Sequence, residues 1–339
     1  MSIRDALDAL INERRDLTED EAADAMDDIF RGEATPALLA AFLVALRMKG
    51  ETVDEVAGMA RTMRDHSWRV KVDGPLLDTC GTGGDGRSTF NVSTASAIVA
   101  AGAGARVAKH GNRAMSSGCG SADVLEALGA KIDLTPEQVA QCIEETGFGF
   151  MFAQAFHPAM KHAGPTRKEL GVRTVFNVLG PLTNPAGAQH QLLGVARPEL
   201  APLLAGALER LGSRHVLVIH GHDGSDELTL EGPNPVYEMN AGETSEYNLD
   251  PRQLGLPTPM PNAIKGGTPE ENARTLTALL AGEQGSVRDA VLLNTAAALV
   301  AADLATNVRE GLPMAAESID SGAAKERLTA FIELTSSFT

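Results

Sequence analysis

The spacing of apolar and polar residues changes near residue 70, and this change predicts two structural units. Before it, Thr18 and Thr52 each stand three residues ahead of a glutamate, and Thr35 is followed by Pro36. A threonine with glutamate three residues later forms a capping box, and proline is favoured at the first helical position. We therefore expect residues 1–67 to form about four helices and no strand.

From about residue 76, short apolar segments alternate with helix-like stretches, which begin at further capping signals such as Thr135-Pro136 and Thr268-Pro269. This alternation is typical of α/β proteins. The predicted fold class is α/β, with a small all-helical N-terminal domain and a larger α/β domain whose mostly parallel central sheet is flanked by helices. The expected strands are Pro75–Thr79, Arg106–Ala108, Gly149–Met151, His215–Ile219 and, on a weaker pattern, Val287–Asn294.

Composition limits the class of protein. The 339 residues are 43% hydrophobic but only 4% aromatic, which indicates a core of Ala, Val, Leu and Ile. No apolar run approaches the roughly 20 residues that span a bilayer, and the polar N-terminus does not resemble a signal peptide. Cys80, Cys119 and Cys142 lack metal-ligand spacing. We expect reduced thiols, a cytoplasmic location and no membrane partner.

The distribution of charge favours a small anionic ligand. The net charge of −16 argues against nucleic acid or an acidic membrane surface as a partner. Cationic residues are instead clustered at Lys109 and Arg113 and again within residues 161–173.

The strongest chemical signal is the segment 80–94, which reads CGTGGDGRSTFNVST. The glycines in 81–86 permit close backbone approach and positive φ, and residues 91–94 open a helix, so free N–H groups can converge on phosphate. No Walker lysine follows. The dinucleotide fingerprint G-x-G-x-x-G does match, but Asp85 would repel a pyrophosphate unless it binds a ribose hydroxyl or a metal shell. A flexible surface loop is the alternative for this segment alone.

A second segment, residues 107–129, repeats this arrangement. A short strand leads into Lys109–Arg113 (KHGNR), then into a loop of Gly and Ser and a helix over 122–128, with Ser121 as the expected N-cap and Gly129 as the C′ residue. Lys109 and Arg113 supply positive charge, and Asn112 can both donate and accept. A surface charge or a core histidine are the alternatives for single residues. Their grouping favours a ligand site.

Asp226 and Glu227 form a candidate metal site in the loop after the expected strand 215–219. Carboxylate oxygens are ligands that Mg²⁺ prefers. A solvated acidic turn is the alternative, although Asp223 and Gly224 indicate an irregular loop.

Several segments together resemble the anthranilate phosphoribosyltransferases, which belong to the nucleoside phosphorylase-like class of phosphoribosyltransferases. They are GTGGDG with TFNVST, KHGNRAMSS, GSADVLEALG, Phe156–Ala186 and His220–Leu230, in order along nearly the whole chain. The resemblance implies a transferase of tryptophan biosynthesis. It would move the phosphoribosyl group of 5-phosphoribosyl 1-diphosphate (PRPP) to the amine of anthranilate, giving N-(5-phosphoribosyl)anthranilate and pyrophosphate, with two Mg²⁺ ions per site.

The resemblance also implies a domain organisation. Residues 1–70, joined by roughly 165–185, would form the helical domain, and residues 71–164 and 186–339 the PRPP-binding domain, with hinges near residue 70 and in 160–185. It further implies a homodimer through the helical domain, for which the apolar residues around Leu38–Leu46 are candidates.

Residue chemistry and the resemblance together give three sets of candidate residues. None is expected to act as acid or base, because an aniline nitrogen is largely neutral at pH 7 and catalysis would be electrostatic and positional. The PRPP set is Gly81, Thr82, Gly83, Gly84, Asp85, Thr89, Asn91, Ser93, Thr94, Lys109, Ser117 and Ser121. The anthranilate set is Gly81, His110, Asn112, His157 and Arg167, with Arg167 matching the family's carboxylate-binding arginine. The metal set is Ser93, Asp226 and Glu227.

Two departures from the family pattern and two rival functions complete the prediction. Phe156 stands where the family usually has tyrosine, and Gly118-Cys119-Gly120 replaces a more polar version. A pyrimidine nucleoside phosphorylase-like enzyme would carry Lys-His-Ser-Thr-Gly-Gly, which is not the pattern here. A non-enzymatic nucleic-acid-binding homologue fits poorly with the retained Arg167 and a pI of about 4.9.

Overall fold

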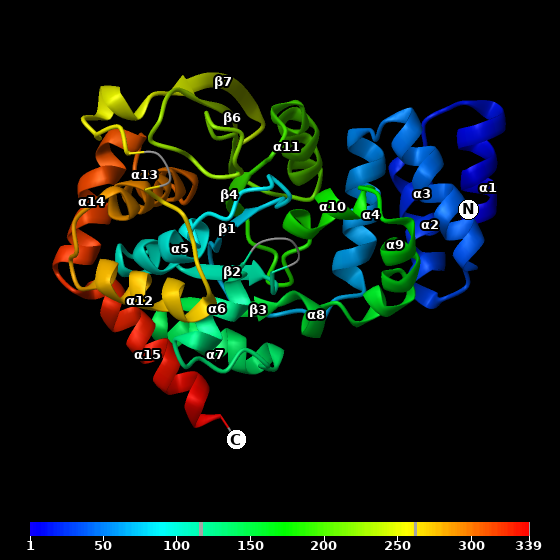
Figure 1. Ribbon diagram of the computed structural model, residues 1–339. Coiled ribbons are helices and arrows are strands. Elements are labelled where there is room, and N and C mark those ends of the chain that lie inside the picture. Colours follow the sequence, from blue (N-terminus) through cyan, green and yellow to red (C-terminus); the bar gives the residue numbers. More distant parts are fainter. Residues whose placement is uncertain (115–117, 261–262, 339) are drawn as a thin grey trace.

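The computed structural model describes residues 1–114, 118–260 and 263–338, and it shows a helical part beside a larger α/β part (Figure 1). The helical part is formed by α1 (Ile3–Asp8), a π-helical turn (Ala9–Glu13), α2 (Glu19–Arg31), α3 (Pro36–Lys49) and α4 (Val53–Asp65). The capping boxes at Thr18 and Thr52 form, and Pro36 occupies the first turn of α3. The prediction of about four helices is confirmed.

The α/β part is built on one seven-stranded sheet in the order β3-β2-β1-β4-β5-β6-β7. Its first five strands in this order pair in parallel, and β6 and β7 continue the sheet antiparallel to β5. The mostly parallel sheet is therefore confirmed. The strands are β1 (Leu77–Gly81), β2 (Val107–Gly111), β3 (Phe148–Phe152), β4 (His190–Gly194), β5 (His215–Ile219), β6 (Asn234–Asn240) and β7 (Glu243–Leu249).

Helices cover the sheet and fill the connections between strands. The α-helices are α5 (Val92–Gly102), α6 (Ser121–Ala127), α7 (Pro136–Thr146), α8 (Ala153–Phe156), α9 (Gly164–Leu170), α10 (Phe176–Leu179), α11 (Ala201–Arg210), α12 (Pro269–Leu280), α13 (Ser286–Ala301), α14 (Val308–Asp320) and α15 (Ala323–Ser337). Short 3-10 turns lie at Pro158–His162, Gly180–Leu182, Pro198–Leu200 and Pro251–Leu254. No helix in the described ranges is long and apolar enough to cross a membrane.

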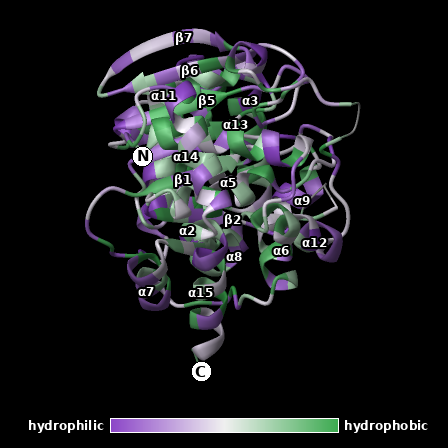
Figure 2. Cartoon of the chain, turned by 90° about the vertical axis from the view of Figure 1, so that its left-hand side faces the viewer, coloured by the Kyte–Doolittle hydropathy of each residue, from purple (hydrophilic) through white to green (hydrophobic). Residues whose placement is uncertain are grey.

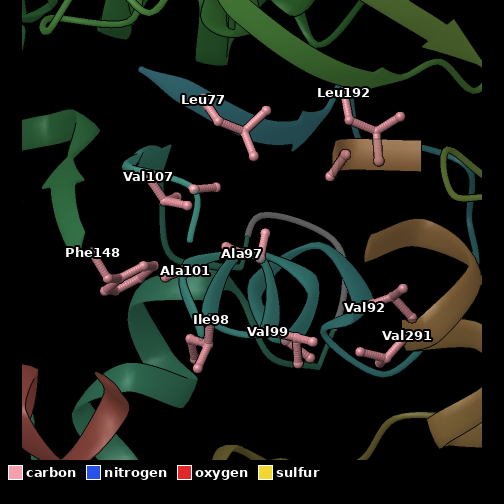
Figure 3. Packing of buried hydrophobic residues seen from close by; sticks show 14 of the residues in the cluster. Leu77, Val92, Ala97, Ile98, Val99, Ala101, Val107, Phe148, Leu192 and Val291 are labelled. Carbon is pink, nitrogen blue, oxygen red and sulfur yellow. The ribbon is translucent and has the colours of Figure 1, made fainter. Parts of the chain in front are cut away.

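Alternate residues of the strands face two hydrophobic cores. Leu217 and Ile219 of β5 join the core around α5 and α13, whereas Val216 and Val218 join the core that also contains α11 and the helical part. This follows from the period of two along a strand. Figure 3 shows the first core, with Val92 and Val99 of α5 near Val291 of α13. Figure 2 shows that the outermost strand, β7, is largely hydrophilic, in agreement with its exposed side chains.

The sequence prediction was wrong in three details of this fold. Residues 287–294 lie within α13, where an Ala-rich apolar run continues to residue 301, a length that suits a buried helix. Strands β4, β6 and β7 were not predicted. Gly120, not Ser121, is the N-cap of α6, because the Asp123 carboxylate accepts the Gly120 N–H at 2.8 Å. Gly129 does follow the helix end with a φ of +98°.

The two parts are joined by a short connection after α4 and by residues 156–185. The Trp68 N–H donates to the Phe156 carbonyl at 3.0 Å, and the Val70 N–H donates to the Pro185 carbonyl at 3.2 Å. Helix α9 packs on α3, and α10 packs on α4. The returning segment thus lies against helices of the N-terminal part before the chain re-enters the sheet at β4.

Candidate active site

Most of the candidate residues gather at one edge of the sheet. The glycine loop leaves the carboxyl end of β1, the KHGNR segment includes the end of the adjacent parallel strand β2, and the Asp226-Glu227 loop follows β5. In open α/β sheets, ligands bind at the carboxyl ends of the strands, especially where the strand order reverses. Here β1 lies between β2 and β4. From β1 the chain continues to β2 and β3 on one side, whereas β4 and β5 lie on the other side of β1, so the strand order reverses at β1.

The glycine loop has the backbone that its composition predicts. Gly83, Gly84 and Gly86 have φ values of +64°, +74° and +72°, which side chains on L-residues rarely adopt. Gly81 is required for a different reason, because a Cβ there would overlap the Asp226 carboxylate. The loop is therefore shaped around the acidic pair as well as around free N–H groups.

Asp226 and Glu227 are bound to the two ends of this loop. Asp226 Oδ2 accepts the Gly83 N–H at 2.7 Å, and Glu227 Oε1 accepts the Ser93 N–H at 3.1 Å, at the first turn of α5. The solvated acidic turn is thus excluded, since both carboxylates are only partly exposed and engage backbone from another segment.

Burial dominates the electrostatics of this pair. It raises the pKa of Glu227 to about 8, with the negative charge of Asp226 adding to the effect. Burial also raises the pKa of Asp226 to about 6. The hydrogen bond from the Gly83 N–H lowers this pKa, and the negative charge of Asp85 offsets part of that lowering. Neighbouring carboxylates that are shielded from water fit a hard divalent cation, which would favour their ionised forms. The described residues contain no cluster of three or more metal-ligating His, Cys, Asp or Glu. Any ion here would need oxygens from a ligand or water.

Lys109 is the one cation in the predicted PRPP set, and it is buried. Its Nζ donates to the Thr79 carbonyl at 2.5 Å and to Ser93 Oγ at 3.4 Å. Burial lowers its pKa, while Asp78 and Glu227 counteract this. Lys109, Ser93 and Glu227 therefore form one connected group beneath the start of α5.

Asn91, Thr94 and Ser121 connect the two loops. The Asn91 amide donates to the Cys119 carbonyl at 3.0 Å and accepts from Asn272 at 2.8 Å. Thr94 Oγ1 donates to Ser121 Oγ at 3.1 Å. These polar groups fix the loops relative to each other.

The remaining candidates of the PRPP set lie around the glycine loop. Thr82 Oγ1 accepts the Ala196 N–H at 3.3 Å, Asp85 accepts the Arg87 N–H at 3.0 Å, and Thr89 pairs with Lys265 in an isolated bridge. Ser117 lies outside the described residues.

Arg113 does not present a free charge, contrary to the sequence-based interpretation. Its guanidinium pairs with Asp123 and Glu126 of α6 and lies over the Phe152 ring. Asn112 is partly exposed, and Gln154 donates to its Oδ1 at 3.5 Å.

His110 and His157 form a second group. Their ring centroids are 5.0 Å apart, and neither Nε2 has a hydrogen-bond partner among the described residues. Burial lowers the pKa of His157 to about 4, and it lowers that of His110 well below the usual value. Both imidazoles are therefore neutral at pH 7, and their unpaired nitrogens suit a polar ligand.

Arg167 lies on α9 of the returning segment. Its guanidinium carbon is 4.8 Å from the centroid of the Phe176 ring, and within the described residues it makes no ion pair. Burial lowers its pKa. The Arg167 side chain is only partly exposed, whereas Lys168 and Glu169 beside it are exposed, so the alternative of an exposed charge run fits those two residues better than Arg167. The structure holds it apart from protein carboxylates, available for a ligand carboxylate.

Sequence reasoning missed several residues that support the site. Buried Asp78 accepts the His110 N–H at 3.2 Å and the Asn184 amide at 2.8 Å, so it links β1, β2 and the returning segment. Burial raises its pKa to about 6. Arg87 of the glycine loop pairs with Asp223 at 2.7 Å. Asp78 carries no signal beyond standing before the glycines, and Arg87–Asp223 depends on pairing across 136 positions.

A cavity lies away from this site. Its volume is about 390 Å³, and it is formed by α12, the following turn and the start of α13. Of the predicted site residues that the structure describes, none lines it. The candidate site is therefore defined by loop geometry and charge.

Comparison with known proteins identifies the family. Residues 4–67 match the helical bundle domain of a glycosyl transferase family, and residues 73–325 match its a/b domain. The anthranilate phosphoribosyltransferase of Roseiflexus castenholzii is 58% identical over 99% of both chains, and that of Chloroflexus aurantiacus is 56% identical with the same coverage. The chain belongs to the anthranilate phosphoribosyltransferase family.

Solved structures of this family share the fold. The Thermus thermophilus anthranilate phosphoribosyltransferase superposes with a TM-score of 0.93 at 48% identity, covering 98% of this chain and 100% of that one. The Saccharomyces cerevisiae family member in complex with PRPP and Mg superposes with a TM-score of 0.91 at 32% identity, covering 99% and 98%. The same yeast protein has also been solved in complex with 4-fluoroanthranilate.

Proposed function

We propose that this chain is an anthranilate phosphoribosyltransferase that transfers the phosphoribosyl group of PRPP to the amine of anthranilate in tryptophan biosynthesis. The observation that carries the proposal is the contact of the glycine loop and the start of α5 with Asp226 and Glu227 at one sheet edge, in a chain of this family. Such a site offers free N–H groups and a place for divalent cations, which are the two requirements of a diphosphate-bearing sugar.

PRPP, the donor of the phosphoribosyl group, would bind along the glycine loop and the start of α5. The PRPP set predicted from the sequence is retained, with three roles distinguished by the contacts. The loop backbone of 81–86 would meet the diphosphate through N–H groups, and Asn91, Thr94 and Ser121 would hold the two loops together. Lys109 and Ser93 would contribute charge and a hydroxyl beneath them.

Mg²⁺ is the metal that the site suits best, and we assign it to Asp226, Glu227 and Ser93. When bound, it would neutralise negative charge on the leaving pyrophosphate. The yeast family member was solved in complex with PRPP and Mg, which supports Mg²⁺ as the metal. Two ions per site stays a prediction.

Anthranilate, the acceptor of the phosphoribosyl group, would lie between the carboxyl end of β2 and the returning segment. Arg167 would pair with the anthranilate carboxylate, while His110, His157, Asn112 and Gly81 would line its path. The neutral amine nitrogen would then attack C1 of the ribose as the C1–O bond to pyrophosphate breaks and the electron pair leaves with pyrophosphate. The nitrogen would afterwards lose its proton to solvent. Since the amine is already neutral, positioning suffices and no general base is assigned.

The domain division and the dimer stay proposals. We assign residues 1–70 with about 165–185 to the helical domain, and 71–164 with 186–339 to the PRPP-binding domain, and we propose a homodimer through the former. Leu39, Phe42, Leu43 and Leu46 are buried in the helical core, so a partner would contact exposed neighbours such as Val44 and Met48. A cytoplasmic location also stays a prediction.

Pyrophosphate release tests the proposal against its rivals. The expected result is release that requires both PRPP and anthranilate, is abolished by a chelator of Mg²⁺, and matches the consumption of anthranilate one to one. Phosphorolysis of a pyrimidine nucleoside without anthranilate turnover would favour the phosphorylase alternative. Binding of nucleic acid without either activity would favour the non-enzymatic one.

A further inference from the structure

Arg173 reaches from the returning segment to the glycine loop. It lies between α9 and α10, and its two terminal nitrogens donate to consecutive carbonyls: Nη1 to Gly84 at 3.3 Å and Nη2 to Gly83 at 3.4 Å. A Cβ on Gly84 would overlap Nη1, so the loop leaves room for this guanidinium. No other cation among the described residues donates to these two carbonyls.

Holding two carbonyls orients the N–H groups that follow them. A trans peptide is planar, with its C=O and N–H pointing in opposite directions. Because the carbonyls of Gly83 and Gly84 face Arg173, the N–H groups of Gly84 and Asp85 face away from it. Neither N–H has an acceptor within the described residues. The preceding N–H, that of Gly83, is held separately by Asp226.

The guanidinium suits this task because it is a fork. Its two nitrogens lie in one plane and can bind two neighbouring acceptors at once, whereas an ammonium is a single point charge. The glycines need such support, since they adopt positive φ but lose more conformational freedom on ordering than other residues do.

The position of Arg173 in the chain also ties the loop to the helical part. Three residues earlier the chain leaves α9, which packs on α3, and three residues later it enters α10, which packs on α4. A change in the position of the returning segment would therefore move the guanidinium and release or engage the loop carbonyls.

We infer that Arg173 is a positioning residue for the PRPP diphosphate: it orders the Gly83 and Gly84 carbonyls so that the Gly84 and Asp85 N–H groups are set to bind diphosphate oxygens. The guanidinium itself contacts the carbonyl side of the loop and not the diphosphate. This inference rests on the proposed function of the glycine loop as the diphosphate site.

Calorimetric titration of PRPP with Mg²⁺, in the absence of anthranilate, tests the inference. Arg173→Ala is expected to weaken PRPP binding by roughly 5- to 20-fold, the loss expected for two long hydrogen bonds of ordinary strength. Arg173→Lys should recover less than half of this loss in free energy, because it keeps the charge but not the fork. Lys168→Ala is the matched control, since Lys168 is an exposed cation on α9 without a hydrogen bond within the described residues, and it should bind PRPP like the unaltered protein.

Steady-state kinetics separate positioning from a general loss of structure. Arg173→Ala should raise the KM for PRPP and leave the KM for anthranilate and the melting temperature nearly unchanged. Unaltered PRPP affinity in Arg173→Ala, full recovery by Arg173→Lys, or equal losses for both substrates would each overturn the inference. If the unaltered protein binds PRPP but does not consume anthranilate, the proposed reaction fails while the calorimetric comparison still decides the role of Arg173.

Discussion

Asp226 accepts a hydrogen bond from the backbone N–H of Gly83 at 2.7 Å, across 143 positions of the chain. The bond joins the two strongest chemical signals in the sequence, the glycine loop and the acidic pair, into one site. It also explains why Gly81 has no side chain, since a Cβ would take the volume of the same carboxylate.

Replacing Gly81 should disturb Asp226 more than the loop itself. Gly81→Ala is expected to raise the KM for PRPP at least tenfold, because the new methyl group must displace the carboxylate. Gly104→Ala is the control: it lies outside the site and nothing lies within 4 Å of its Cβ position, so it should cost only the roughly 1 kcal/mol of a positive φ in unfolding free energy. Kinetics and thermal melts of both variants measure this difference. Equal kinetic losses would contradict a specific contact between Gly81 and Asp226.

Removing either acidic charge should change the response to metal. Asp226→Asn and Glu227→Gln keep the size of each side chain but lose charge, so half-maximal activity should require at least tenfold more Mg²⁺. Titration of activity with MgCl₂ at fixed PRPP checks this. Asp223→Asn is a useful comparison, because Asp223 lies in the same loop as the acidic pair but pairs with Arg87 of the glycine loop. A metal requirement that stays the same in both acidic-pair variants would refute their role as ligands.

Arg167 should matter for the acceptor alone. Loss of a charged hydrogen bond to the anthranilate carboxylate costs about 1.5–3 kcal/mol, so Arg167→Ala should raise the KM for anthranilate by roughly 10- to 100-fold. The KM for PRPP should change little. Steady-state kinetics with each substrate varied in turn give both values, and an unchanged KM for anthranilate would exclude Arg167 from the acceptor site.

The stability of the protein should depend on pH through His215, at the start of β5. Burial lowers the pKa of this imidazole, but its hydrogen bonds to Glu238 and Asp303, at 2.8 and 2.6 Å, outweigh burial and raise it above 6.5. A raised pKa means that the stabilisation is complete below the ordinary value and is lost as pH rises through the folded-state value. His215→Gln should therefore lower the free energy of unfolding more at pH 6 than at pH 9. Urea unfolding at both pH values measures this, and a loss independent of pH would contradict the charged interaction.

Local signals in the sequence predicted the starts of helices and the main segments of the site. Capping residues such as Thr18 and Thr268 form their boxes in the structure, since a cap depends on residues three positions apart. The acidic pair and the glycine loop were recognisable from composition and spacing. Their mutual contacts were not, because they depend on the order of strands in the sheet.

What could not be predicted depends on distant partners. The apolar run at 287–294 suits a strand or a buried helix, and only its packing against α5 and α14 decides. Strand β7 has almost no buried face, so it lacks the apolar alternation that marks strands. Arg113 looked like a ligand cation, yet α6 supplies two carboxylates that pair with it. Arg173 belongs to the predicted cationic cluster, but its particular role gave no local signal, because it depends on the carbonyls of Gly83 and Gly84.

The fluorescence of anthranilate, followed during incubation with PRPP, Mg²⁺ and the purified protein, tests the central claim most directly. The account predicts a loss of fluorescence that stops when either substrate is exhausted, does not occur without PRPP and ceases when Mg²⁺ is chelated. Fluorescence that persists at saturating PRPP and Mg²⁺ would contradict it.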